Sequence, residues 1–494
     1  MLCTPTLSAT DAVLNKTVPV KCTECGTQAE TPMARRRIDV ADVTPVVRGY
    51  PAAIVSNGIA FVSGVRGGFY DTNRGMAEIP EALRANWRDF DIAHSTEGEV
   101  AVDSWFVHAN LDRVLRAAGT DVSQILRRHT WQRDKRFFPV HEKMRMHWET
   151  VPAPSSGLGV AEVAGRFSRW LGYDALAAVP GEHPLLTGRA TVQTFDNKSL
   201  PSASYYSQAV ACGPLVFLAG HIPIKTHEPG KPVVRGFDDV PTEGRFLATG
   251  RSHPDSREGP LAAQAWYVYE QIRGNLAAQG LAMQDVVHMN VFLQDIRDFG
   301  TLHRVHRHWY PDASPALSVT GFNEVGHRGT LLEIELTAVK RTDDFITESI
   351  AWPEREPFAG PAAVRTGPLC FFAGMLGLNE AGQLVTGTDE LDDEIGRRVV
   401  SDLARYESNR GFAAQCWAVW RLLERVCAKA GLTLEQLAKT TVYVRTVKDI
   451  WIYEEIRAAF LQGHSLPAIE FVAIQSPGPV PAAHVQIDAL ASVD

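Results

Sequence analysis

The most informative stretch of this sequence is "GPLVFLAGHIPI", residues 213–224, because closely similar stretches occur twice more in the chain. They read "NGIAFVSGVRGG" at 57–68 and "GPLCFFAGMLGL" at 367–378, and we interpret all three as the same β-strand. The central glycines of these stretches lie at intervals of 156 and 154 residues; they are Gly64, Gly220 and Gly374. Such a fixed period predicts that one structural unit occurs three times.

The elements that follow this strand are repeated as well. An amphipathic helix is predicted over 261–280, with apolar residues at helical spacing and Gly280 as its left-handed end. Gly119 and Gly431 hold the corresponding positions. A second helix is predicted later in each unit, with an aromatic residue near its end: Trp148, Trp309 or Phe460.

Two further strands complete each unit. A strand before the second helix is predicted at 125–132, 286–293 and 437–444. A closing strand is predicted at 172–179, 331–339 and 485–493, and "DALA" occurs in the first and third of these. Each unit thus reads strand–strand–helix–strand–helix–strand–strand, which is typical of an α+β layer with helices on one face of a sheet.

The predicted units span residues 41–185, 195–342 and 350–494, with polar, proline-marked linkers between them. Residues 1–40 are expected to form a disordered leader without a function of its own. The lone Cys22-Thr-Glu-Cys25 pair in that leader lacks the second ligand pair that a structural zinc site needs. We expect the uncovered sheet faces to close against each other around a pseudo-threefold axis, with sheets inside and helices outside.

The composition is ordinary for a soluble globular protein. The formal net charge of −8 argues against nucleic acid or an anionic membrane as the main partner. No apolar run approaches the ~18 residues of a membrane span, and the first residues lack a secretory layout. The seven cysteines form no disulfide framework, so a cytoplasmic location is expected.

The order of elements, the "FLAG" and "FVSG" strands, "NVFLQDIRDF" at 290–299 and the "EIE" of the closing strand resemble the RidA (YjgF-like, reactive-intermediate deaminase) superfamily. The resemblance covers about residues 45–494, once in each of the three units, and is clearest in the second unit. It implies a chorismate-mutase-like fold and clefts between neighbouring units, because the family's members are usually single-domain homotrimers. It further implies hydrolysis of enamine or imine intermediates and no cofactor.

In that family an arginine of a "P-A-R-S" motif clamps the substrate carboxylate. The corresponding stretches here read "PALS", "PAIE" and "PSSG", so the resemblance puts Leu317, Ile469 and Ser156 at the arginine position. None of these side chains can form a bidentate charged clamp. Deamination of a small amino-acid-derived imine is therefore not the expected reaction.

Other positions of the family's site retain polar residues. The resemblance implies a last-strand acid at Glu333, Asp174 and Asp488, and a second-helix residue at His303, Glu142 and Glu454. The interface tyrosine corresponds to Tyr50, Tyr206 and Gly360. In the "PSSGLGV" stretch at 154–160, backbone N–H groups turned towards an anion are an alternative to the lost arginine.

Plainer interpretations remain open for two of these residues. Glu333 alternates with Leu332 and Ile334, so it belongs either to a solvated outer face or to a cleft. In the cleft it would have a raised pKa and act as a general acid or base. His303 is a metal ligand, a cleft acid or base, or a surface histidine, and we expect no metal site because no carboxylate or cysteine supports it on the same helix.

Sequence alone leaves the hand of the arrangement open. One hand brings Tyr50 to the second unit, and the other brings Tyr206 to the first unit and Tyr50 to the third. We favour the first, with Tyr50, His303 and Glu333 as catalytic residues in one cleft beside Leu317. The remaining positions are expected to contact substrate: Tyr206, Ser156, Asp174, Asp488 and Glu142.

Two functions are consistent with this pattern. The first is an enzyme that acts by general acid/base chemistry on an enamine, imine or related unsaturated metabolite. The second is a non-catalytic metabolite-binding or scaffold protein of a biosynthetic pathway. The trimer-like core is expected to form within one chain, and whether that chain is a monomer or assembles further stays open.

Overall fold

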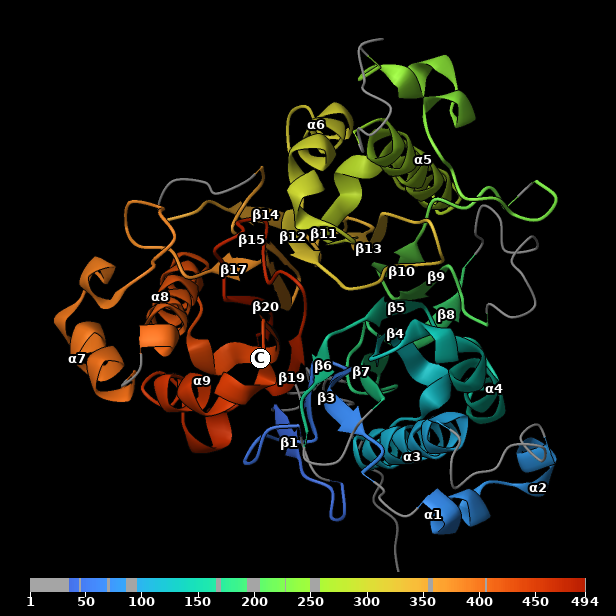
Figure 1. Ribbon diagram of the computed structural model, residues 1–494, viewed down its shortest axis with the longest axis horizontal. Helices are drawn as coiled ribbons and strands as arrows, with labels where there is room; N and C mark the ends of the chain where they lie inside the picture. The colour runs from blue at the N-terminus through green and yellow to red at the C-terminus, as the bar shows by residue number, and fades with distance from the viewer. Residues whose placement is uncertain are drawn as a thin grey trace, which may run out of the picture. The chain divides into compact units, whose positions relative to one another are not determined.

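In the computed structural model, the structure describes residues 35–43, 46–68, 72–85, 96–165, 170–192, 205–226, 228–248, 258–353, 359–404 and 407–493. The expected leader falls mainly on residues 1–34, outside this part of the chain. The residues from Met33 onward form one unit by their contacts. Its secondary structure is organised around three sheets (Figure 1).

The first sheet has the strand order β1-β2-β3-β7-β4-β5. Its strands are β1 (Arg36–Ile38), β2 (Ala53–Ser56), β3 (Ile59–Arg66), β4 (Ile125–Gln132), β5 (Ser155–Gly159) and β7 (Leu171–Ala178). The helices of this segment are α1 (Thr72–Glu78), α2 (Glu81–Arg84), α3 (Thr96–Ala117) and α4 (Phe138–Trp148). The long helix α3 packs on β3 and β7, and α4 packs on α3.

The second sheet repeats this order as β8-β9-β10-β13-β11-β12. Its strands are β8 (Arg189–Thr191), β9 (Ala209–Cys212), β10 (Leu215–His221), β11 (Val286–Leu293), β12 (Ala316–Gly321) and β13 (Leu332–Val339). The helices are α5 (Glu258–Ala277) and α6 (Phe299–Trp309). Strand β11 runs parallel to β12 and antiparallel to β13, as β4 does to β5 and β7.

The third sheet has the order β14-β15-β16-β20-β18-β19-β6. Its strands are β14 (Thr347–Ile350), β15 (Ala363–Thr366), β16 (Leu369–Phe372), β17 (Met375–Leu376), β18 (Leu437–Val444), β19 (Ala468–Ala473) and β20 (Val485–Ser492). The last position is taken by β6 (Glu162–Val163), which comes from the first segment of the chain. The helices are α7 (Glu394–Leu403), α8 (Glu407–Lys429) and α9 (Ile450–Arg457).

The central strand of each sheet was predicted correctly, because its apolar pattern is strong and local. The strands predicted at 125–132, 286–293 and 437–444 are β4, β11 and β18, and all of their residues are buried. The helix-ending glycines adopt positive φ, as expected; they are Gly119, Gly280 and Gly431.

The outer strand of each sheet was missed. Strands β1, β8 and β14 lie within the expected leader or the expected linkers, and they pair antiparallel with β2, β9 and β15. Residues 36–38 therefore belong to the first sheet and not to a leader. These strands are three or four residues long and partly exposed, so they carry little apolar periodicity.

The three sheets contact one another in a cycle of backbone hydrogen bonds. The Gly159 amide donates to the Glu324 carbonyl at 2.8 Å, which joins the first sheet to the loop after β12. The Gly321 amide donates to the Ser476 carbonyl at 2.8 Å, which joins the second sheet to the third. Strand β6 pairs with β19 and closes the cycle between the third segment and the first.

A buried polar network lies where the three sheets meet. The His129 ring lies between Asp174 of β7, at 3.1 Å, and Glu335 of β13, at 2.8 Å. Lys439 of β18 is 2.9 Å from Asp174 and donates to the Val62 carbonyl at 2.6 Å. Burial acts to lower the pKa of His129, but the two carboxylates raise it to about 10. His129 is thus a cation shared between two sheets.

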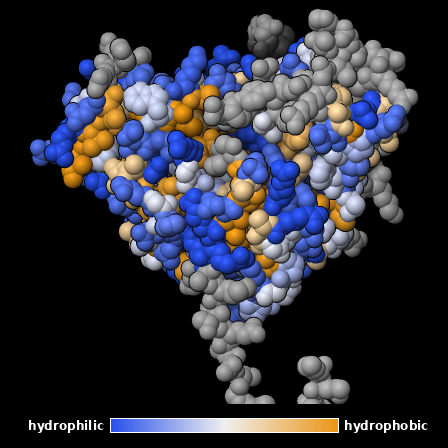
Figure 2. Space-filling model, turned by 90° about the horizontal axis from the view of Figure 1, so that it is seen from below, coloured by the Kyte–Doolittle hydropathy of each residue, from blue (hydrophilic) through white to orange (hydrophobic). Residues whose placement is uncertain are grey.

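Figure 2 shows a face on which hydrophilic residues prevail and hydrophobic residues form separate patches. In the described part of the chain, no helix combines the length and apolar character required to cross a bilayer.

Replacing Lys439 tests whether the network holds the sheets together. The variant Lys439→Met leaves the buried Asp174 carboxylate with one cationic neighbour fewer, and breaking a buried pair in this way costs about 3–5 kcal/mol. Equilibrium urea unfolding should show that loss. The exposed Lys340 offers a control, since Lys340→Met should stay within about 0.5 kcal/mol of the unmodified protein. A loss below about 1 kcal/mol for Lys439→Met would contradict the role given to the network.

Candidate functional site

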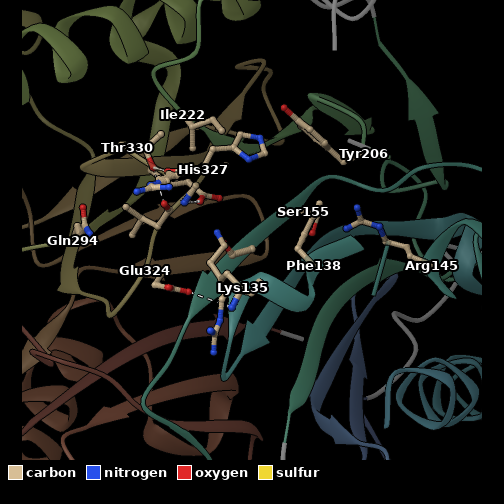
Figure 3. Close-up of a pocket in the computed structure, with 18 residues that line it drawn as sticks. Lys135, Phe138, Arg145, Ser155, Tyr206, Ile222, Gln294, Glu324, His327 and Thr330 are labelled. Atoms are coloured by element: carbon tan, nitrogen blue, oxygen red, sulfur yellow. Dashed lines mark hydrogen bonds between the residues drawn. The ribbon is translucent and has the colours of Figure 1, made fainter. Parts of the chain in front are cut away.

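A pocket of about 590 Å³ lies between the first and second segments of the chain. Residues of η3 (Lys135–Phe137), α4 and β5 form one wall, and residues of β10, β13 and the loop between β12 and β13 form the other. Figure 3 shows Lys135, Phe138 and Arg145 on the first wall, opposite His327 and Thr330. Tyr206 lies at the pocket's edge in the same view. This volume is in the range of small-molecule sites.

Glu333 is the most buried carboxylate of this pocket, with 3% of its surface exposed. The Gly326 amide donates to its Oε2 atom at 3.1 Å, and the Gly157 amide also bonds to the carboxylate. Burial raises the pKa of Glu333 to about 7, although Lys135 and the two amides act to lower it. Burial excludes the solvated outer face that was one interpretation of this residue.

Gly220 makes room for this carboxylate. A Cβ atom at Gly220 would lie 1.9 Å from Glu333 Oε1, so any side chain there would displace the acid. The pairing of β10 with β13 shifts between Leu218 and His221, which is the irregularity of a β-bulge. The repeated glycine of the sequence is therefore a requirement of the site as well as of the strand.

Lys135 lies beside Glu333 on the opposite wall. Its ammonium donates to the Gly157 carbonyl at 2.6 Å, and its backbone amide donates to Glu324 at 3.2 Å. Burial lowers the pKa of Lys135, while Glu333 and Glu324 act to raise it. Gly157 thus contacts both groups, with its amide on Glu333 and its carbonyl on Lys135.

The corresponding cleft between the third and first segments is filled. Ladder pairing puts Gly172 of β7 at the position of Glu333, because each lies two residues before the acid of the polar network. The Arg66 side chain occupies this space and forms a buried ion pair with Glu470. This cleft therefore has no carboxylic acid free to act on a substrate among the described residues.

The cleft between the second and third segments has lost the acid in a different way. Gln486 of β20 holds the position of Glu333 and lies against Gly374, as Glu333 lies against Gly220. An amide cannot exchange a proton as a carboxyl group does. Among these three equivalent positions, only that of Glu333 carries an acid.

The ladder pairing corrects the predicted set of acids. Asp174 and Asp488 correspond to Glu335, since they pair with His129, Thr441 and Asn290 at the same place on the central strands. They lie two residues beyond the position of Glu333 and belong to the polar network between the sheets. A small cavity of about 60 Å³ adjoins that network. Burial raises the pKa of Asp488 to about 7, against hydrogen bonds from Ser318 and Gln486.

The grouping of Tyr50, His303 and Glu333 in one cleft is wrong. The Tyr50 hydroxyl donates to Glu454 of α9 at 2.9 Å, so this tyrosine meets the third segment. His303 is partly exposed on α6, contacts the Phe299 ring and does not line the pocket. The observed contacts follow the other hand of arrangement, in which Tyr206 meets the first segment.

Tyr206 and Glu142 both lie close to Arg145, a residue of the pocket wall. Glu142 accepts a hydrogen bond from the Tyr205 amide and forms an ion pair with Arg145. The Tyr206 hydroxyl acts to raise the pKa of Arg145. Tyr206 and Arg145 line the pocket, and Glu142 supports Arg145 from behind. The acid and the tyrosine of the pocket thus come from the second segment, and the helix residues come from the first.

The arginine position also needs a correction of one residue. Pairing of β5 with β4 puts Ser155, and not Ser156, at the position of Leu317 and Ile469. Ser155 lines the pocket, while the Ser156 hydroxyl donates to Glu335. Leu317 is 2% exposed and belongs to the apolar core.

The sequence interpretation did not single out several charged residues of the pocket, among them Lys135, Arg145 and Arg328. Lys135 and Arg145 lie in the first unit, where the resemblance is weakest. The turn reads "KRFF" at 135–138, "IRDF" at 296–299 and "VKDI" at 447–450, so Lys135 stands where the other units have Ile296 and Val447, and this departure was the available signal. No cluster of three or more histidine, cysteine or acidic residues suitable for a metal occurs in the part of the chain that the structure describes.

Comparisons with known proteins agree with the resemblance. A family model described as Endoribonuclease L-PSP matches residues 244–340. Protein DfrA of Myxococcus xanthus is 30% identical over 136 residues, which are 27% of this chain and 84% of that protein. A protein of Dermatophagoides farinae named 2-iminobutanoate/2-iminopropanoate deaminase is 26% identical over 136 residues, which are 27% of this chain and 84% of the relative.

Among solved structures, RidA from the Antarctic bacterium Psychrobacter sp. PAMC 21119 is similar at 26% identity and a TM-score of 0.23. The match covers 30% of this chain and 99% of that one. The chain belongs to the RidA (YjgF-like) superfamily, which includes reactive-intermediate deaminases, and it has the α+β fold of that superfamily.

The raised pKa of Glu333 makes a prediction about stability and pH. The folded protein holds the proton up to the raised pKa of about 7, whereas the unfolded chain releases it near the ordinary glutamate pKa of 4.5. The stabilisation from this proton is complete below pH 4.5 and is lost as the pH rises to 7. Glu333→Gln lacks the titration, so its free energy of unfolding relative to the unmodified protein should rise by about 3 kcal/mol between pH 4.5 and pH 8.

Urea unfolding of the two proteins at a series of pH values measures this difference. Lys135, Glu335 and His327 are present in both proteins, so their own titrations largely cancel. A difference that stays constant with pH would contradict the raised pKa.

Proposed function

We propose that this protein is an enzyme that acts by general acid/base chemistry on an unsaturated small-molecule metabolite in the pocket between its first and second segments. The observation that carries the proposal is the buried Glu333 carboxyl in a cavity of about 590 Å³, with a pKa of about 7. At that pKa both protonation states are populated at neutral pH, which is the condition for efficient acid/base work.

The reaction that fits best is hydrolysis of a C=N bond. Ionised Glu333 takes a proton from a water molecule while the water oxygen bonds to the imine carbon. Glu333 passes this proton to the imine nitrogen, which gives a neutral carbinolamine. It then takes the proton of the carbinolamine hydroxyl and passes it to the amine nitrogen as the C–N bond breaks, so that ammonia leaves and the oxo compound forms. Glu333 ends in its starting state, so the water and the imine balance the products without a co-reactant. The similarity to the Dermatophagoides farinae protein named 2-iminobutanoate/2-iminopropanoate deaminase supports this class of reaction.

We further propose that the three sheets form an intramolecular pseudo-trimer in which a single cleft has kept the reaction. Support comes from the common strand order and from the cyclic contacts between the sheets. The other two clefts hold Gly172 with the Arg66–Glu470 pair, or Gln486, where the pocket has Glu333. Fusion of three units in one chain allows such divergence, which a homotrimer with three identical clefts does not.

Glu333→Gln tests the proposed function. Imino acids of several sizes, generated in situ from amino acids by an amino-acid oxidase, serve as substrates, and release of the 2-oxo acid is followed against the spontaneous rate. The variant should lose about 10²–10⁴-fold in turnover, because removal of a general acid/base has that effect.

The matched control is Glu348→Gln on the edge strand β14, an exposed glutamate remote from the pocket, and it should retain full turnover. Equal turnover by Glu333→Gln and the unmodified protein would overturn the assignment. So would an unmodified protein that binds these compounds but never accelerates their hydrolysis, the result expected of a non-catalytic binding protein.

A further inference from the structure

The cations of the pocket differ in how their charge is balanced. Arg136 pairs with Asp134 at 2.5 Å, and Arg145 pairs with the buried Glu142. Lys135 is only partly exposed, and within the described residues it has no carboxylate at ion-pair distance. Its ammonium bonds to a neutral acceptor, the Gly157 carbonyl. Glu333 and Glu324 act on this charge only from beyond ion-pair distance. A partly buried ammonium without a direct ion pair is unfavourable, so this wall of the pocket favours an incoming anion.

The position of Lys135 is fixed by its own backbone. The Asp134 side chain accepts a hydrogen bond from the Arg136 amide and caps the turn at Lys135–Phe137. The Lys135 amide donates to Glu324 across the pocket. With the backbone fixed, the hydrogen bond to the Gly157 carbonyl holds the ammonium at the pocket wall, and it needs no large rearrangement to meet a ligand.

The same wall brings the ammonium next to the reacting acid. Gly157 bonds to Glu333 through its amide and to Lys135 through its carbonyl. An anionic group on Lys135 would leave the adjoining part of the ligand at the Glu333 carboxyl. The two contacts together fix one end of a small substrate.

The rest of the pocket is larger than such an end requires. Apolar and aromatic side chains of both walls line it, namely Phe138, Tyr206, Ile222 and Val325. A volume of about 590 Å³ suits a ligand with a ring-sized body better than a four-carbon acid. Aromatic side chains also provide favourable packing for a planar ring.

We propose that Lys135 is the anion-binding residue of this pocket, and that the substrate is an unsaturated carboxylate with an apolar, ring-sized body. This inference rests on the proposed function and names the substrate class of the same site. Lys135 binds the carboxylate, Glu333 lies at the adjoining unsaturated carbon, and the body packs against Phe138 and Ile222. Arg328 at the exposed rim adds long-range attraction for an anion.

The test uses three stable probes whose binding to the full chain is measured by calorimetry: phenylpyruvate, its primary amide and 2-oxobutanoate. Phenylpyruvate should bind at least about tenfold more tightly than its amide, and more tightly than 2-oxobutanoate. In Lys135→Met the preference for the carboxylate over the amide should disappear, and in Lys135→Arg it should largely return. Raising the salt concentration should weaken phenylpyruvate binding more in the unmodified protein than in Lys135→Met, where Arg328 alone attracts the anion from the rim.

Lys340→Met is the control lysine variant and should keep the preference. A purely structural role of Lys135 would weaken all three probes together, and that outcome overturns the inference. Equal affinity for phenylpyruvate and its amide in the unmodified protein, or no measurable binding of either, overturns it as well. Tighter binding of 2-oxobutanoate than of phenylpyruvate contradicts the ring-sized body.

Failure of this inference can be told apart from failure of the proposed function. If Lys135→Met keeps its preference for carboxylates while Glu333→Gln abolishes turnover, the pocket is catalytic but recognises its substrate in another way. If the carboxylate preference depends on Lys135 while Glu333→Gln leaves turnover unchanged, the binding role stands and the catalytic assignment falls.

Discussion

The contact between His129, Asp174 and Glu335 is the constraint on which the rest of the site depends. It ties the closing strands of two sheets to one ring, and Lys439 adds the third sheet through Asp174. Buried charges of this kind lose hydration, and their mutual pairing repays that cost only in one geometry. A network with several members from different sheets therefore disfavours other ways of packing the sheets. Glu335 lies two residues from Glu333 on the same strand and on the same face. By fixing Glu335 against the first segment, the network also brings Glu333 against Gly157 and Lys135.

The three equivalent clefts share one backbone arrangement but differ in the side chain at the position of Glu333. Where the acid position is a glycine, the space is taken by Arg66, whose guanidinium pairs with Glu470 and bonds to the Ala164 carbonyl at 2.6 Å. Where it is Gln486, the neighbouring strand presents apolar Leu317. Each change removes a titratable group from a cleft and replaces it with packing or with a closed ion pair. The sheets remain joined in all three cases, because the contacts between them run through backbone groups and the polar network.

Sequence patterns predicted what local forces determine. The central strands and the helix-ending glycines follow from apolar periodicity and from left-handed backbone geometry, and these do not depend on distant residues. The acid of the closing strand was misplaced in two units because "EIE" offers Glu333 and Glu335 two residues apart, on one face of the strand. Ladder pairing and the bulge near Gly220 decide between them, and both are tertiary features. The partner of Tyr50 was misassigned because the hand of the arrangement depends on which sheet edges meet, and single-strand patterns carry no such information. Lys135 was missed because its role comes from a contact with Gly157 of another strand.

Glu333 and Glu335 demonstrate that burial alone does not set the chemistry of a carboxyl group. Both are almost completely buried on β13, and burial acts to raise the pKa of each. Glu335 faces His129 and Arg127 and accepts hydrogen bonds from His129 and Ser156, so its pKa is lowered and it stays ionised. Glu333 faces one ammonium and two backbone amides, which do not fully offset burial, and its pKa settles at about 7. The charge of Glu335 holds the sheets together, so protonation of this carboxylate would break the contact between them. Glu333 can gain and lose a proton while the fold stays intact, because no ion pair between the sheets is formed through it among the described residues. This division of roles on one strand explains why a proton-exchanging group can exist next to a network that requires fixed charges.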